Sequence, residues 1–349
     1  MFKILSIKDP HFQYGFMSKI RKDYERDKDN KLEFINKFCK ENDIYDIIFT
    51  GDVLDKSSKK WSFKQYGLNK RKLNKLKHTD SRSIKLYSNV GNHDMENGLE
   101  NPDLDDHTVT TVFEELVYDE VLINITREPL INNTVMIYGI NFSADKNIIL
   151  SELERINTIP SNDKCKIVVL HSNVTPDEER LTDFLYKDLA ERFEDIDIFI
   201  NGHYHIGFDT KLIQRPRGKK AYFVNNWNLC RVMRDYDVTL NKHNVNMEYI
   251  QIGELKEIAG VKQREIITQS IDIPHLTYEE AFNIKNINLL KKTKDEVFEF
   301  FENNKIQELA SFKDSDETLL DRINRSRKDN GQKEITQKVL DRIKDYLEL

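Results

Sequence analysis

The sequence predicts an α/β protein whose first half alternates strands with helices and whose later strands are joined by turns. Short apolar runs such as 2–7 and 44–50 are separated by segments with helical spacing, whereas 210–214 and 221–225 flank the turn signature Arg215-Pro216-Arg217-Gly218. This combination indicates a mixed sheet, or two sheets face to face with helices outside. At 349 residues the chain is long enough for one domain of roughly 250 residues and a smaller one.

The elements of the first hundred residues follow from their apolar spacing. Residues 2–7 alternate apolar with polar or small side chains, and 44–50 and 84–90 are apolar runs typical of buried strands. A helix at 31–41 has an inner face of Leu32, Ile35, Phe38 and Cys39. A second helix is expected at 63–76, between the last two of these strands.

The middle of the chain is less regular. We expect a hairpin that joins 121–125 with 134–141, then a helix at 146–157 and a strand at 166–170. A further helix at 178–193 leads to the apolar run 196–200. Antiparallel strands then continue to about Gly253.

Beyond residue 254 the chain becomes charged and rich in helical spacing. Helices are expected at 276–283, 293–303, 317–327 and 334–349, the last with an apolar stripe of Ile335, Val339, Ile343 and Leu347. Such a stripe packs on its own domain or binds a partner, and both readings stay open. We therefore predict a main domain of residues 1–254 and a helical C-terminal region of residues 255–349.

The composition is that of a soluble protein of the cytoplasm. Hydrophobic residues make up 38% of the chain and charged residues 33%, and no apolar run approaches the ~20 residues needed to cross a bilayer. No cationic segment precedes a long apolar stretch at the N-terminus, so we expect no signal peptide and no membrane association. Three scattered cysteines indicate reduced core thiols.

Five short polar clusters each follow an apolar run. They are Asp9-Pro10-His11, Gly51-Asp52, Gly91-Asn92-His93-Asp94, His171 and Gly202-His203-Tyr204-His205. In α/β sheets the loops at the carboxyl ends of the strands converge, so clusters far apart in sequence can meet in one crevice. Each cluster alone is more often a turn or a helix start than a ligand site, but five in this arrangement supply a complete ligand set.

Together the clusters provide the hard oxygen and imidazole ligands that suit two divalent metal ions. Asp52 is the candidate for the bridging carboxylate that a two-metal site needs. Asp9, His11 and His205 would complete the shell of the first ion, and Asn92, His171 and His203 that of the second. In an extended strand His203 and His205 point to the same side, about 6 to 7 Å apart, and can serve different ions.

The expected nucleophile is a metal-bridging hydroxide, because such ions lower the pKa of water towards ~7. His93 is then free to stabilise the transition state or to protonate the leaving oxygen, with Asp94 orienting and charging its ring. The other histidines, His78, His107, His243 and His275, lack such context, and we expect them to be surface or structural residues.

The five clusters resemble the motifs of the calcineurin-like metallophosphoesterase superfamily, in the same order, from Asp9 to His205. The resemblance implies a four-layer α/β/β/α sandwich, here followed by the helix-rich C-terminal extension. It also implies the ligand roles given above. The expected cofactors are two divalent metal ions, manganese first, with iron or zinc as alternatives.

Within that superfamily the chain resembles the SbcD-type nuclease subunit of double-strand-break repair complexes, which include phage and bacterial forms. This likeness rests on the N-terminal position of Asp9-Pro10-His11, the helix before Gly51-Asp52-Val53-Leu54-Asp55, the length, and the C-terminal extension. It implies a nuclease domain at 1–254, a C-terminal region that caps DNA or binds a partner, an SbcC-like ATPase subunit, and a homodimer. A viral form would act in the host cytoplasm.

A basic stretch supports nucleic acid as the substrate. Residues 56–85 contain eleven Lys or Arg against one acid, Asp80, in a chain of net charge −6. Cations beside the metals can neutralise phosphates, and aromatic rings can stack on bases. The candidate DNA-binding residues are Lys59, Lys60, Trp61, Lys64, Lys70, Arg71 and Lys72, with Arg215 and Arg217 in a second positive turn. The alternative is a solvated helix face in a lysine-rich protein.

Three functions remain open from the sequence. The first is metal-dependent hydrolysis of DNA phosphodiesters by an exonuclease or endonuclease that acts in repair or recombination. The second is a phosphatase or phosphodiesterase that acts on a small phosphoester. The third, a metal-stabilised binding scaffold, is disfavoured because the ligand set is complete and His93 is present.

Overall fold

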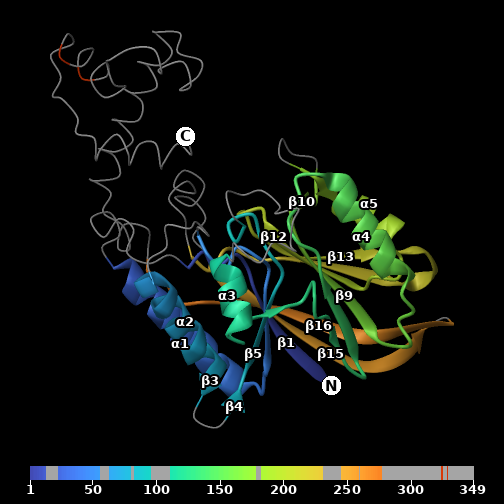
Figure 1. The fold of residues 1–349 in the computed structure, drawn as a ribbon. Coiled ribbons are helices and arrows are strands. Elements are labelled where there is room, and N and C mark those ends of the chain that lie inside the picture. Colours follow the sequence, from blue (N-terminus) through green and yellow to red (C-terminus); the bar gives the residue numbers. More distant parts are fainter. Residues whose placement is uncertain are drawn as a thin grey trace. The chain divides into compact units, whose positions relative to one another are not determined.

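The computed structural model describes residues 1–12, 23–55, 63–79, 82–95, 111–177, 182–230, 245–258 and 260–276, and the single residues 324 and 328. All but the last two belong to one compact unit, whose elements are shown in Figure 1. Among the described residues, no helix is long and apolar enough to traverse a lipid bilayer.

The first sheet carries three of the five polar clusters. In the described chain its strand order is β16-β15-β1-β2-β5-β6. The strands are β1 (Phe2–Ile7), β2 (Asp46–Phe49), β5 (Lys85–Ser88), β6 (Ile123–Asn124), β15 (Asn246–Ile258) and β16 (Val261–Asp272). β1, β2, β5 and β6 are parallel, whereas β15 is antiparallel to both β1 and β16. The loops with Asp9, Asp52 and Asn92 therefore leave from one edge.

The second sheet carries the remaining two clusters. Its order is β13-β14-β12-β9-β8-β7. The strands are β7 (Leu130–Ile131), β8 (Val135–Gly139), β9 (Cys165–Ser172), β12 (Ile198–His203), β13 (Phe208–Gln214) and β14 (Lys220–Asn225). β8, β9, β12 and β14 are parallel, and β9 and β12 pair with Gly202 opposite His171. This register places His171 beside His203.

Helices cover the outer faces of both sheets (Figure 1). The principal ones are α1 (Tyr24–Glu41), α2 (Phe63–Lys77), α4 (Lys146–Thr158) and α5 (Tyr186–Arg192), with the shorter α3 (Val112–Tyr118) before β6. The ring of Phe38 in α1 meets that of Tyr249 in β15, with centroids 6.2 Å apart. Small elements complete the unit: strands β3 (His78–Thr79), β4 (Arg82–Ser83), β10 (Val174–Thr175) and β11 (Phe184–Leu185), and a 3-10 turn, Pro216–Gly218.

Strand β9 shows how the layers are held together. Side chains alternate along a strand, so Ile167 and Val169 enter the core between the two sheets, while Val168 and Leu170 enter the core under α4 and α5. All four are fully buried, as expected of a parallel strand covered on both faces. The layers follow in the order helix, sheet, sheet, helix, which confirms the predicted fold class.

Several predicted elements lie where the sequence placed them, among them β1, α2, α4, β13 and β14. The predicted hairpin between 121–125 and 134–141 is wrong. β6 pairs with β5 in the first sheet, whereas β8 belongs to the second sheet and forms a hairpin with β7. One backbone bond, from Gly139 N to Ile125 O at 3.2 Å, joins the two segments where the sheets approach.

Two helix boundaries also differ. α1 begins seven residues before the predicted start at Lys31, because its first turns are charged and lack an apolar stripe. α5 begins only at Tyr186, because Phe184–Leu185 pair with β10 as the short strand β11. Local spacing cannot distinguish such a strand from the first turn of a helix.

The antiparallel strands run further than the expected end at Gly253. β15 continues to Ile258, and β16 extends to Asp272 in the same sheet. The predicted domain boundary at residue 254 therefore falls within β15. The charged residues in the second half of this strand have the composition expected of a charged tail. The helices expected at 276–349 lie outside the described residues, except for Leu276, Asn324 and Lys328, and stay a prediction.

Candidate metal centre

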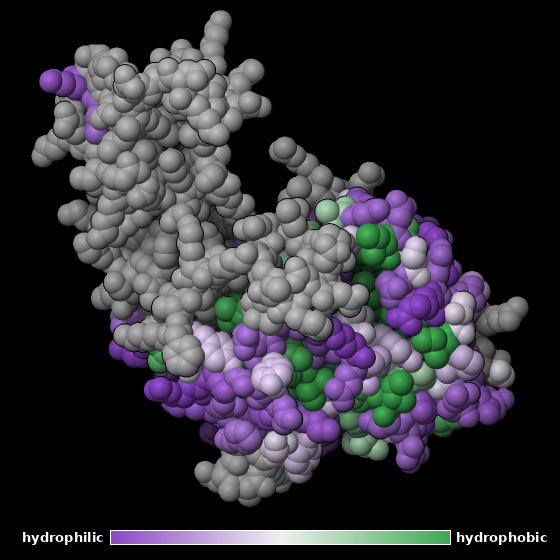
Figure 2. Space-filling view, viewed as in Figure 1, coloured by the Kyte–Doolittle hydropathy of each residue, from purple (hydrophilic) through white to green (hydrophobic). Residues whose placement is uncertain are grey.

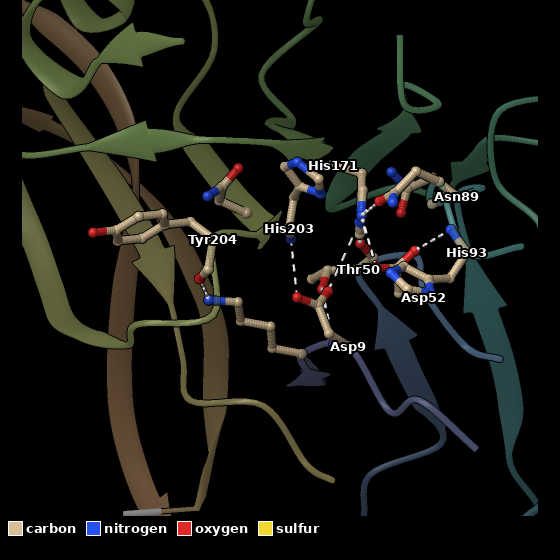
Figure 3. A network of polar contacts seen from close by, with 12 residues as sticks. Asp9, Thr50, Asp52, Asn89, His93, His171, His203 and Tyr204 are labelled. Atoms are coloured by element: carbon tan, nitrogen blue, oxygen red, sulfur yellow. Dashed lines mark hydrogen bonds and ion pairs between the residues drawn. The ribbon is translucent and has the colours of Figure 1, made fainter. Parts of the chain in front are cut away.

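The loop after β1 is bent sharply around two buried ligand candidates. Asp9 and His11 are both 0% exposed, and their φ angles of 35° and 45° lie in the left-handed region, which costs energy for a residue with a side chain. Asp9 accepts hydrogen bonds from Thr50 Oγ1 at 3.0 Å and from the backbone N–H of His203 at 2.9 Å. Asp9 therefore links β1 to the ends of β2 and β12 (Figure 3).

Asp52 lies at the same edge, after β2. Two glycines, Gly51 before it in the sequence and Gly91 beside it in space, allow neighbouring groups to pack closely around it. A Cβ on Gly51 would lie 2.6 Å from His171 Nδ1, and one on Gly91 would lie 2.1 Å from Asp52 Oδ1. Asp52 Oδ1 accepts from the backbone N–H of His93 at 2.9 Å. The buried Oδ2 has no hydrogen-bond partner in the described structure. It faces His11 Nε2 at 3.8 Å and His171 Nε2 at 3.2 Å.

His171 is oriented by the backbone. Its Nδ1 donates to the Thr50 carbonyl at 2.6 Å, so Nε2 is directed at Asp52 Oδ2 and at Asn92 Oδ1, each 3.2 Å away. Burial opposes protonation, but the Asp52 and Asp9 carboxylates and the Thr50 carbonyl together outweigh it and raise the pKa of His171 to about 9. A divalent cation that binds both Nε2 and Oδ2 would displace the proton from Nε2.

The same interactions also shift the pKa values of Asp52 and His203. Burial opposes ionisation of Asp52, but His171, with His93 and His11, holds the pKa of that carboxyl well below its usual range. Burial, together with the nearby His171, lowers the pKa of His203 to about 3. A neutral imidazole beside an ionised carboxylate is the form in which both bind a metal.

The predicted ligands gather into groups of the size that a metal ion needs. Asp9, His11 and His205 form one group, and Asp52, His171 and His203 form another, each with ligand atoms within 4.8 Å of one another. The two Nε2 atoms of His11 and His205 are 3.3 Å apart. Asp52 faces a histidine from each group, as expected of a bridging carboxylate. The structure thus brings together all seven predicted metal-ligand residues.

His203 and His205 reach their separate groups by a different route from the one expected. The extended geometry predicted for them is wrong, because His203 ends β12 with a φ of 75°. This turn directs His203 towards His171, with ring centroids 5.0 Å apart, and carries His205 to His11, with centroids 5.2 Å apart.

His93 lies beside the first group. Its ring meets that of His11 edge to face, with centroids 5.0 Å apart, and its Nδ1 is 2.6 Å from the Asp55 carbonyl. A carbonyl oxygen only accepts, so Nδ1 carries the proton and Nε2 is the nitrogen available for proton transfer. Asp55 also belongs to a third group with His11 and His93.

The predicted role of Asp94 is wrong. Its fully buried carboxylate accepts from the backbone N–H groups of Gly91 at 3.0 Å, Leu54 at 3.0 Å and Val53 at 3.3 Å. Burial and the Asp52 charge raise the pKa of Asp94 to about 7. Asp94 thus ties two loops together, and the backbone of Asp55 orients His93. The sequence cluster that contains Asp52 also contained Asp55, but nothing local marked its carbonyl.

The predicted DNA-binding residues lie in four different situations. Lys59, Lys60 and Trp61, and the side chains of Lys64 and Arg217, lie outside the described part of the chain. Lys70 pairs with Asp119 at 2.6 Å, the buried Lys72 pairs with Asp29 at 3.1 Å, and Arg71 is exposed.

Arg215 contradicts the prediction. It is 6% exposed, and its guanidinium donates to the carbonyls of Ala190, Phe193, Glu194 and Ile196. These are carbonyls at and beyond the C-terminus of α5, where a cation is favourable. Its donors are therefore used within the fold and are directed away from a DNA backbone.

Comparisons with known proteins agree with this geometry at the level of a family. The family model described as calcineurin-like phosphoesterase matches residues 2–207, a span that includes every predicted metal ligand. No curated protein sequence matches the chain. Among solved structures, the crystal structure of TT1561 of Thermus thermophilus is similar with 12% identity and a TM-score of 0.38, over 70% of this chain and 93% of that one.

Proposed function

The chain belongs to the calcineurin-like phosphoesterase family, and from this premise we propose that it is a metal-dependent DNA nuclease of the SbcD type. Metal-dependent hydrolysis of phosphoesters follows from the family. The observation that supports it at atomic level is the buried Asp52 Oδ2, which has no hydrogen-bond partner in the described structure and faces the Nε2 atoms of two histidines. Such an oxygen is costly unless a positive charge lies beside it, either the protonated His171 or a metal ion that replaces its proton.

The residues present fit two divalent ions, for which manganese is our first candidate and iron or zinc the alternatives. Asp9, His11 and His205 would hold one, Asn92, His171 and His203 the other, and Asp52 both. Bound ions would lower the pKa of water and neutralise charge on the phosphate. The buried ligands are anchored to backbone groups of neighbouring strands, so little reorganisation is needed when the ions bind.

His93 would supply a proton to the leaving oxygen. Because Nδ1–H donates to the Asp55 carbonyl, Nε2 is the nitrogen that would carry the transferable proton. As a water oxygen bonds to phosphorus, the P–O bond to the leaving group breaks, its electron pair stays on the leaving oxygen, and that oxygen takes the proton from Nε2. General acids of this kind contribute about 10²- to 10⁴-fold to the rate.

The basic stretch supports DNA as the substrate. Residues 56–85 carry eleven cations against one acid and begin directly after Asp55, whose carbonyl holds His93. Arg71, Lys75 and Lys85 are exposed among the described residues, and Figure 2 shows a mostly hydrophilic surface in the region of α1 and α2. Lys85 pairs with Asp46 at the ends of β5 and β2 opposite to the site, so contacts with DNA phosphates near the metals would come from the part of the basic stretch that directly follows Asp55.

A small phosphoester is the second candidate substrate. It is favoured because Lys70 and Lys72 form ion pairs with acidic residues and Arg215 donates hydrogen bonds to backbone carbonyls within the fold. Fewer cations then remain for a DNA backbone than the sequence alone suggests.

The proposed partners follow from the SbcD resemblance. We propose an SbcC-like ATPase subunit that binds the C-terminal region, a homodimer, and action in a cytoplasm, which would be that of the host if the protein is viral. The charged C-terminal region supports the first of these proposals by its composition alone.

The test is manganese-dependent degradation of end-labelled double- and single-stranded DNA, with bis-p-nitrophenyl phosphate in parallel and His93→Ala as the matched variant. We expect cleavage of DNA by the wild type and a loss of about 10²- to 10⁴-fold in His93→Ala, with metal content unchanged. Hydrolysis of the small diester without DNA cleavage, also when the ATPase is added, would favour the second candidate.

A further inference from the structure

A buried lysine that the proposed chemistry does not use lies next to the metal centre. Lys8 directly precedes Asp9 and is 0% exposed. Its Nζ donates to the carbonyl oxygen of Tyr204 and, at 2.8 Å, to Oδ1 of Asn225. Figure 3 shows the first of these bonds as the dashed line that ends at Tyr204. Tyr204 is the residue between the two histidines of the last cluster.

The partners of Lys8 hold both sides of His205. Lys8 binds the carbonyl before it, that of Tyr204, and Asn225 Nδ2 donates to the carbonyl after it, that of Ile206, at 2.9 Å. The backbone of Lys8 is itself fixed, because its carbonyl accepts from Leu229 N at 2.9 Å. The chain is thus tied to β1 just before His205 and to the end of β14 just after it.

His203 is held by a separate contact. Its backbone N–H donates to Asp9 Oδ2 at 2.9 Å. Asp9 and Lys8 are neighbours in the chain, so one short segment fixes the backbone on both sides of the turn between His203 and His205. This turn sends one ring to the group with Asp52 and His171, and the other to the group with Asp9 and His11.

A buried ammonium group is unfavourable unless its hydrogen bonds are satisfied, and an apolar side chain could fill the same space. Packing alone therefore gives no reason for a lysine here, whereas an anchor for a ligand loop does. Groups that orient metal ligands typically contribute about 10- to 100-fold to metal affinity, which is the factor lost when they are mutated.

We propose that Lys8 is a positioning residue, which holds the Tyr204 carbonyl so that His205 reaches the ion bound by Asp9 and His11. The inference rests on the metal-binding part of the proposed function and is independent of the substrate. Its specific consequence is that removal of the ammonium group weakens the binding of one of the two metal ions and leaves the binding of the other unchanged.

The experiment compares Lys8→Met with Lys166→Met in the full chain. Lys166 is an equally buried lysine, 0% exposed, whose Nζ donates to the carbonyls of Ile156, Asn157 and Ile159. It lies five residues before His171 on β9, about 16 Å from that histidine in an extended strand. Both variants lose a buried cation, but only Lys8→Met should affect the centre.

Manganese binding to the metal-free protein is measured by calorimetric titration. We expect Lys8→Met to bind one of two ions about 10- to 100-fold more weakly, and Lys166→Met to be destabilised with both affinities unchanged. Lys8→Arg, which keeps a cationic donor, should recover part of the loss. Wild-type affinities in a folded Lys8→Met variant, or an equal loss in Lys166→Met, would overturn the proposal.

If Lys8→Met does not fold, Asn225→Leu removes the other anchor of the same loop. The same selective loss then supports the proposal, and unchanged affinities contradict it. Wild-type protein that binds two ions but cleaves no DNA would refute the nuclease function and leave this inference standing. Wild-type protein that binds no divalent ion would refute both.

Discussion

The ligand residues of the centre are placed by an unfavourable backbone. Asp9, His11, Asp52 and His203 all have φ between 35° and 75°. A left-handed conformation costs a residue with a Cβ about 1 kcal/mol or more, so four such residues in one site represent stability given up for geometry. The surrounding hydrogen bonds, such as that from His203 N to Asp9, hold these conformations in place.

Gly91→Ala should disrupt the centre, because the new methyl group would lie 2.1 Å from Asp52 Oδ1 and 2.3 Å from Asp52 N. We expect at least a tenfold loss of manganese affinity and a destabilisation of about 1–3 kcal/mol. Gly67→Ala in α2 is the control, since nothing lies within 4 Å of its Cβ. It should raise the unfolding free energy by about 0.5–1 kcal/mol. Chemical denaturation and metal titration of both variants check this, and a Gly91→Ala variant with full metal affinity would contradict it.

Glu248 should make stability depend on pH. Burial raises its pKa to about 7, and the hydrogen bond from Thr210 Oγ1, 2.7 Å from Oε1, opposes this only in part. The folded protein thus binds the proton more tightly than the unfolded chain, whose glutamate pKa is about 4.3. The stabilisation that this tighter proton binding gives the folded protein is complete below about pH 4.3, the pKa of the unfolded state, and is lost as the pH rises through about 7.

Glu248→Gln stays neutral and keeps an acceptor for Thr210. Its unfolding free energy should exceed that of the wild type above pH 7, by up to about 3 kcal/mol, and this advantage should vanish near pH 4. Glu41→Gln, at an exposed ion pair with Lys37, is the control and should change stability little at either pH. An advantage of Glu248→Gln that is equal at both pH values would exclude this carboxyl as the cause.

Among the elements, the two helices that cover the second sheet, α4 and α5, end at buried cations. Lys166 donates to three carbonyls at the end of α4, and Arg215 to four at and beyond the end of α5. The last carbonyls of a helix lack intrahelical partners and carry partial negative charge, so a cation satisfies both needs. Arg215 belongs to the turn between β13 and β14, and therefore joins α5 to the sheet beneath it.

Arg215→Met should destabilise the protein by about 2–4 kcal/mol, because it leaves buried carbonyls without donors. Lys219→Met, which removes a partly exposed pair with Asp195, should cost at most about 1 kcal/mol. Urea unfolding measures both. DNA affinity of the folded Arg215→Met variant should equal that of the wild type, and a large selective loss would restore Arg215 as a DNA-binding residue.

At the scale of the whole molecule, charge is distributed unevenly. The net charge is −6, yet residues 56–85 hold eleven cations against one acid. Part of this charge is neutralised where Lys70 and Lys72 meet Asp119 and Asp29. The remaining exposed cations decide whether the site attracts a polyanion or a small ester.

DNA affinity should therefore fall steeply with salt. Contact with about five phosphates gives a slope of about −4.5 for log affinity against log salt, and each lost contact reduces its magnitude by about 0.9. Lys59→Gln with Lys60→Gln, the predicted DNA-binding lysines nearest to Asp55 in the sequence, should remove about two contacts, whereas Lys187→Gln on α5 should remove none. Fluorescence anisotropy at several salt concentrations measures the slopes, and a wild-type slope near zero would exclude a DNA backbone as the ligand.

The candidate site was predictable from the sequence where a residue type and its position after an apolar run indicate a metal ligand. Each candidate ligand residue follows an apolar run. Asp52 lies just after β2 and His171 lies near the end of β9, and these positions in two sheets suffice to bring them to one edge. The predicted roles of Asp94 and Arg215 were wrong because the sequence does not show whether a carboxylate or a guanidinium faces a substrate or the protein backbone. Lys8 and the Asp55 carbonyl gave no local signal at all.

The sequence by itself determined the α/β class, the candidate ligand set and the order in which the strands deliver it, because apolar periodicity and residue chemistry are local properties. Only the tertiary structure decided which strands share a sheet, as with β6 and β8, and which polar groups are used up inside the fold. Pairing of strands and burial of charge depend on contacts between segments far apart in the chain, such as Lys8 with Tyr204. No local pattern carries that information.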